Sequence, residues 1–103
     1  MKPAISALCL MSLSAACDGS RATADECTRM LDRYTHMVAP VPRETIERGP
    51  DEEKAAREEL VRQKRATDDY ARSHAQCTAE VTKREYRCAM RAPNPESWQA
   101  CID

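Results

Sequence analysis

The chain has 103 residues and a formal net charge of −1, with 16 Lys and Arg against 17 Asp and Glu. The charges are interspersed along the sequence, so the composition favours neither nucleic acid nor a polybasic membrane patch as a partner. Only two glycines are present, which excludes a glycine-rich phosphate loop. Three Tyr, one Trp and no Phe indicate a small core, and domains of this size commonly need covalent staples.

The N-terminal residues have the pattern of an export signal. Lys2 is the only charged side chain before an apolar stretch, residues 4–16, that is too short to span a bilayer. Small residues then lead into Cys17, the position of the lipidated first residue of a bacterial lipoprotein. We therefore expect residues 1–16 to be a lipoprotein signal peptide, acyl chains such as palmitate on Cys17, and a tether over residues 17–23.

Two other interpretations of this region stay open. A lipoprotein signal normally has Leu three positions before the cysteine, whereas here Ser14 holds that position and Leu13 lies one place further out. Ala22-Thr23-Ala24 offers an ordinary signal peptidase site, which would release a soluble secreted protein. A buried helix of a cytosolic protein fits less well, because the stretch has no acidic residue and contains Cys9.

The remaining chain, residues 24–103, predicts one all-α domain that begins with a helix over 24–38. Thr23 and Glu26 have the spacing of a capping box. Apolar residues then recur at helical spacing on one face, namely Cys27, Met30, Leu31, Tyr34, Met37 and Val38. Three prolines and a glycine in residues 39–50 predict a linker.

Three further helices follow in the prediction. Pro50 and the acidic residues after it predict the start of a long helix over 51–76. Most of its circumference is charged, so we expect a partly solvated strut. Thr82 and Glu85 form a second capping box before a helix over 83–91. Asn94 then has the position of an N-cap for a last helix over 95–102.

Four cysteines remain after export and lipidation: Cys27, Cys77, Cys88 and Cys101. An even number in an exported chain predicts two disulfides. If the helices over 24–38 and 51–76 are antiparallel, the longer second helix carries Cys77 beyond the start of the first. This geometry favours Cys27–Cys88 with Cys77–Cys101, and the other two pairings stay open.

Two sets of side chains are candidates for binding. His74 and Cys77 lie one helical turn apart, as in a zinc-ligand pair or a thiol with its base. A disulfide at Cys77 removes both possibilities, so we expect no catalytic residue, no metal and no cofactor. Trp98 is a possible contact for a partner, although the simpler interpretation is that it covers the core beside Cys101.

Arginines are numerous around the cysteine-bearing helices. A carboxylate or phosphate ligand is one interpretation, and salt pairing with Glu26, Asp32 and Glu85 is the simpler one. These arginines are Arg29, Arg33, Arg84, Arg87 and Arg91.

Parts of the chain resemble small cysteine-containing lipoproteins of myxobacteria and related bacteria, whose activity is unknown. The matching stretches are Cys27-Thr-Arg-Met-Leu-Asp-Arg-Tyr34, then Cys77, then Glu80-Val-Thr-Lys-Arg-Glu-Tyr-Arg-Cys-Ala-Met90, then Trp98-Gln-Ala-Cys101. The resemblance covers about residues 25–38 and 77–102. It implies an envelope location and disulfides, and no catalytic residues.

The sequence therefore predicts a small lipoprotein, lipid-anchored at Cys17 to the inner or outer membrane of the cell envelope. We expect a non-catalytic protein-interaction or accessory module, with an unidentified envelope protein as partner and no small-molecule substrate. The alternative function is that of a soluble secreted inhibitor or effector, released by cleavage after Ala24.

Overall fold

The computed structural model describes residues 20–103, so Cys17 and the expected signal peptide lie outside the described residues. The prediction of an all-α fold is confirmed. Within these residues the helices are α2 (Ala24–Val38), α3 (Arg43–Glu47), α4 (Pro50–Arg65), α5 (Asp68–Glu80), α6 (Lys83–Arg91) and α7 (Pro95–Ile102). The only extended pairing in this part of the chain is an isolated bridge between Arg21 and Thr82.

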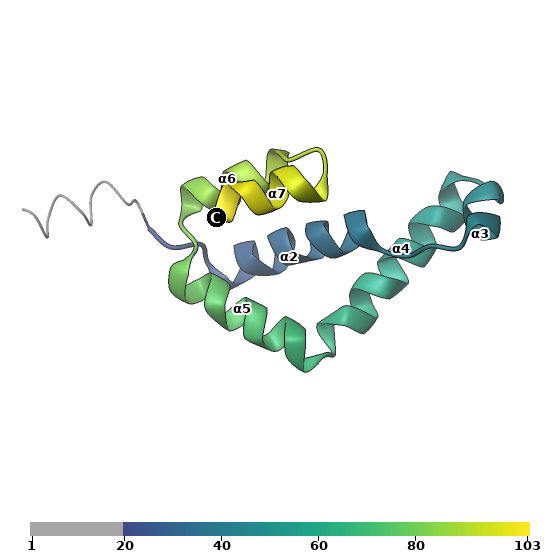
Figure 1. Ribbon diagram of the computed structural model, residues 1–103. Helices are drawn as coiled ribbons and strands as arrows, with labels where there is room; N and C mark the ends of the chain where they lie inside the picture. Colours follow the sequence, from purple (N-terminus) through teal and green to yellow (C-terminus); the bar gives the residue numbers. More distant parts are fainter. Residues whose placement is uncertain (1–19) are drawn as a thin grey trace, which may run out of the picture.

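Helix α2 forms the centre of the molecule and contacts α4, α5, α6 and α7. Figure 1 shows α6 and α7 along one side of α2, with α5 and then α4 along the other. Helix α4 continues past the end of α2 and carries α3, which contacts no other described helix. We call α3 and the adjoining half of α4, residues 43–57, the arm.

Side-chain caps start three of the helices where the sequence predicts them. Thr23 accepts a hydrogen bond from the backbone of Glu26, whose carboxylate accepts from the Thr23 N–H at 2.9 Å. Thr82 and Glu85 repeat this capping box at α6. Asn94 accepts from the N–H of Ser97 at α7. Each cap satisfies backbone donors that lack a partner within the helix.

The predicted helix over 51–76 is two helices, and the linker over 39–50 contains a short helix. Thr67 has an extended backbone (φ −93°, ψ 155°) and caps α5 by accepting from Tyr70 N–H. Basic residues end α4 and acidic residues begin α5, so both helix dipoles are complemented at the break. Gly49, with φ 122°, connects α3 to α4, and only glycine adopts this conformation without strain.

The core is small and lies between α2, α5, α6 and α7. Met30 and Cys27 are its largest fully buried side chains, and Ala89 is also completely buried. Helices α3 and α4 contribute no buried residue, which agrees with the predicted solvated strut. The stable part of the molecule is therefore the end that contains the disulfides, and the arm projects from it.

The predicted disulfide pairing is wrong. Cys27 is bonded to Cys77, with Cα atoms 6.0 Å apart, and Cys88 is bonded to Cys101, with Cα atoms 5.6 Å apart. The prediction assumed one straight helix that carried Cys77 past the start of α2. The break at Thr67 instead turns α5 back along α2, which brings Cys77 beside Cys27, while α6 and α7 pair as a hairpin (Figure 1).

Candidate binding groove

The prediction that Trp98 contacts a partner is wrong, because this side chain is in the core. Only 5% of Trp98 is exposed, and its indole N–H donates to the carbonyl of Met30 at 3.0 Å. Its ring lies 4.7 Å from that of Tyr34, centroid to centroid. The simpler interpretation, that Trp98 covers the core, is confirmed.

His74 and Cys77 hold α5 against α2. His74 Nε2 lies 2.9 Å from the carbonyl oxygen of Ala24 and 3.1 Å from Thr28 Oγ1. Both contacts join α5 to the first turn of α2. Cys77 is bonded to Cys27. Residues 20–103 contain no group of three or more His, Cys, Asp or Glu placed to hold a metal ion.

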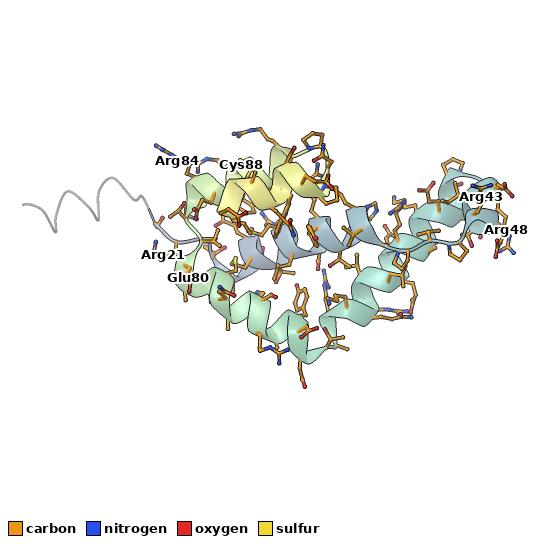
Figure 2. The ribbon with its side chains drawn as sticks, viewed as in Figure 1. Arg21, Arg43, Arg48, Glu80, Arg84 and Cys88 are labelled. Carbon is orange, nitrogen blue, oxygen red and sulfur yellow. A yellow bond between two sulfur atoms is a disulfide. The ribbon has the colours of Figure 1, made fainter. Side chains whose placement is uncertain are left out.

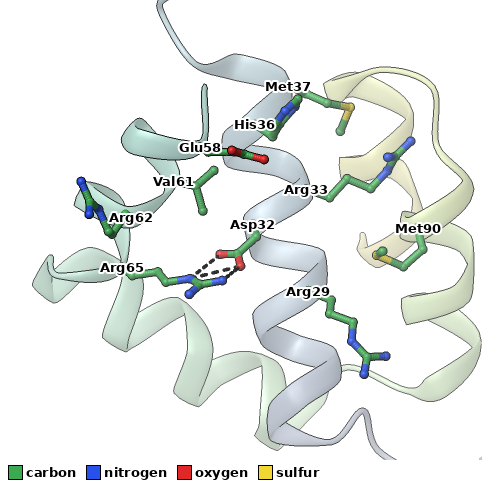
Figure 3. A pocket seen from close by; sticks show the side chains of 10 residues that line it. All are labelled: Arg29, Asp32, Arg33, His36, Met37, Glu58, Val61, Arg62, Arg65 and Met90. Carbon is green, nitrogen blue, oxygen red and sulfur yellow. Dashed lines mark hydrogen bonds and ion pairs between the residues drawn. The ribbon is translucent and has the colours of Figure 1, made fainter. Parts of the chain in front are cut away.

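A solvent-open groove of about 610 Å³ runs over the face of α2 that lies between α4 and α6. Helical spacing brings a set of α2 side chains to this face, and four α4 side chains form one wall (Figure 3). The apolar part of the surface comes from Met37, Val61 and Met90. The other lining residues are Arg29, Asp32, Arg33, His36, Glu58, Arg62 and Arg65.

An ion pair across α2 and α4 fixes the α4 wall. Arg65 Nε donates to both carboxylate oxygens of Asp32, at 3.2 and 3.1 Å, and Nη2 donates to the same carboxylate. The hydrogen bonds and the charge of Asp32 raise the pKa of Arg65 above its usual value. Tyr70 also donates to Asp32, at 3.3 Å, and burial raises the pKa of this hydroxyl. The α4–α5 bend is thus tied to α2.

Arg33 borders the groove without a carboxylate partner among the described residues. Its Nη2 donates to the carbonyl of Ala92 at 2.6 Å, and its Nε is buried with no hydrogen-bond partner there. A guanidinium group that meets only a backbone carbonyl keeps most of its positive charge uncompensated. Arg33 therefore supplies the groove with a cation that an incoming carboxylate can neutralise.

The predicted salt pairs have different partners in the structure. Asp32 pairs with Arg65, and Glu26 pairs with Lys83 at 2.9 Å. Glu85 caps α6, and Arg29 pairs with Asp25 at 2.8 Å. Arg65 and Val61 were not predicted as site residues, because no local pattern indicates which face of α4 meets α2.

The resemblance to small lipoproteins stays a prediction, and the function has to be argued from the geometry of the chain itself. No helix within residues 20–103 has both the length and the apolar character needed to cross a membrane. Comparison with protein-family models, with curated proteins and with solved structures gave no match to this chain.

Proposed function

We propose that this protein is a non-catalytic lipoprotein of the bacterial cell envelope that binds an envelope protein through the groove. Residues 1–16 direct export, and lipid on Cys17 anchors the folded part to the membrane. The two disulfides support an exported location, because such bonds persist in oxidising compartments. The small core is consistent with a domain that depends on them.

The groove is the single observation that carries the binding role. It combines an apolar surface with cationic side chains, and the methionines Met37 and Met90 adapt readily to the shape of a partner. Arg33 provides uncompensated positive charge at its edge. The complementary ligand is a protein segment with apolar side chains flanked by a carboxylate, and a helix is the usual form of such a segment in a groove.

Cross-linking in living cells tests this role. A photoreactive amino acid at Val61, which lines the groove, should give a cross-linked adduct of defined mass with one envelope protein. Ala55 is exposed on the same helix and is not a groove residue, so the same amino acid there is the matched control. Equal adducts at both positions, or none under any growth condition, would contradict the proposal.

A charge substitution provides a second measurement. Val61→Asp places a carboxylate in the groove and should weaken binding of the captured protein at least about tenfold. The carboxylate repels an acidic partner and puts a hydrated charge into the apolar surface. Ala55→Asp adds the same charge outside the groove and should leave the affinity unchanged. Since Val61 is only half-buried, both variants should fold.

The alternative, a soluble factor released by cleavage after Ala24, is less compatible with the packing around α2. That cleavage would remove Ala22, which is 4% exposed and donates from its N–H to the carbonyl of Val81 at 2.8 Å. It would also remove Thr23, the N-cap of α2, and leave a positive terminus at the positive end of the helix dipole. The mass of the mature N-terminus distinguishes a lipidated Cys17 from a free Asp25.

A further inference from the structure

Three arginines form an exposed row along the outer face of α6. Arg84, Arg87 and Arg91 are spaced three and four residues apart, so they lie on one face of the helix. All three are exposed, and none takes part in an ion pair within residues 20–103. We call these residues the α6 arginine row.

Three acidic side chains near the start of α6 have other partners. Glu85 accepts from the backbone of Thr82, and Glu26 accepts from Lys83. Asp25 accepts from Arg29. The guanidinium groups of the α6 arginine row therefore stay open to solvent and form no ion pair within residues 20–103.

The α6 arginine row begins where the chain leads towards Cys17. The N–H of Lys83 donates to the carbonyl of Ser20 at 2.9 Å, and Arg21 bridges to Thr82. Figure 2 shows Arg84 and Arg21 at the same end of the molecule. Cys17 precedes Ser20 by three positions, which span at most about 10 Å of extended chain. A lipid on Cys17 would thus keep the start of α6 close to the headgroups.

We propose that α6 lies on the surface of an anionic bilayer, with the α6 arginine row in contact with phospholipid headgroups. The orientation rests on the proposed lipid anchor, whereas the contact itself does not require it. One guanidinium group can donate two parallel N–H hydrogen bonds to the oxygens of a phosphate. Because α5 and α4 lie across α2 from α6 (Figure 1), this orientation turns them away from the bilayer and towards other proteins.

Vesicle binding by the chain that starts at residue 17, carrying Cys17→Ser, tests the contact without the anchor. Mass spectrometry first confirms both disulfides, and circular dichroism confirms the helices. We expect sedimentation with phosphatidylglycerol-containing vesicles, no sedimentation with phosphatidylcholine alone, and weaker binding as salt rises. Each arginine near an anionic surface should contribute about fivefold to the partition coefficient.

The matched variants remove three charges from opposite ends of the molecule. R84Q/R87Q/R91Q should weaken partitioning about 100-fold, as three fivefold steps multiply. R43Q/R48Q/K54Q removes the same charge from the arm, whose Arg43 and Arg48 lie far from Arg84 in Figure 2, and should change partitioning less than about threefold. All six side chains are exposed, so both variants should fold.

Several results would overturn the inference. These are an equal loss in both triple variants, equal binding to neutral vesicles, no binding to either vesicle, or stronger binding to soluble polyglutamate than to vesicles. The mass of the mature N-terminus from cells separately tests the anchor. If the protein is lipidated but R84Q/R87Q/R91Q does not weaken vesicle binding, this inference is refuted and the proposed function is left intact. If the protein is not lipidated but binds vesicles through the α6 arginine row, this inference holds and the proposed lipid anchor is refuted.

Discussion

Removing the Cys27–Cys77 disulfide should destabilise the protein more than removing Cys88–Cys101. The first bond joins residues separated by 50 positions and the second by 13. In the chain-entropy description, constraining these loops in the unfolded state contributes about 4 and about 3 kcal/mol respectively. Cys27 and Cys77 are 0% and 4% exposed, so replacing them with alanine also opens a cavity in the core.

The measurement compares Cys27→Ala/Cys77→Ala with Cys88→Ala/Cys101→Ala by urea unfolding, followed by far-ultraviolet circular dichroism. With a denaturant dependence of about 1 kcal/mol per molar urea, the midpoint should fall by about 4 M or more in the first variant and about 3 M in the second. Peptide mapping without reduction confirms the remaining bond. An equal or reversed order would refute the argument from loop length and burial.

Three other changes test the caps and the core. Trp98→Phe removes the indole N–H that donates to the Met30 carbonyl, together with part of a buried ring. It should lower the free energy of unfolding by about 1–3 kcal/mol in urea titrations, through the lost hydrogen bond and the space left in the core. Thr82→Ala should lower it by about 1 kcal/mol through loss of the α6 cap, seen as a lower thermal midpoint. Burial raises the pKa of Tyr70 above 10.0, so its stabilising contribution is complete below pH 10 and is lost as pH rises through the folded value. Tyr70→Phe should flatten stability profiles measured above about pH 10.

Helix starts were predictable because their causes are local. The caps at Thr23, Thr82 and Asn94 depend on side-chain contacts with backbone groups three residues away, and these spacings are visible in the sequence. The bend at Thr67 has the same kind of cap. It was not predicted because strong helix formers continue up to Thr67 and the intrinsic preference of these residues hid the cap.

Features that join distant segments could not be predicted in the same way. The observed disulfide pairing depends on the direction of α5 after the bend. The extended conformation of Thr67 was not predicted, and this one residue was enough to make the predicted pairing wrong. The groove depends on the contact between Arg65 and Asp32, which are 33 positions apart. Cations occur throughout α4, so the sequence does not indicate which of them faces α2.

The attachment of residues 20–22 to the loop between α5 and α6 has a mechanical consequence. A pull on the chain from its N-terminal side meets two backbone hydrogen bonds, from Lys83 N–H to the Ser20 carbonyl and from Ala22 N–H to the Val81 carbonyl, which together form the Arg21–Thr82 bridge. Just behind them the Cys27–Cys77 bond receives the remaining force. The path of the force therefore ends inside the disulfide-bonded end of the molecule and does not pass through the arm.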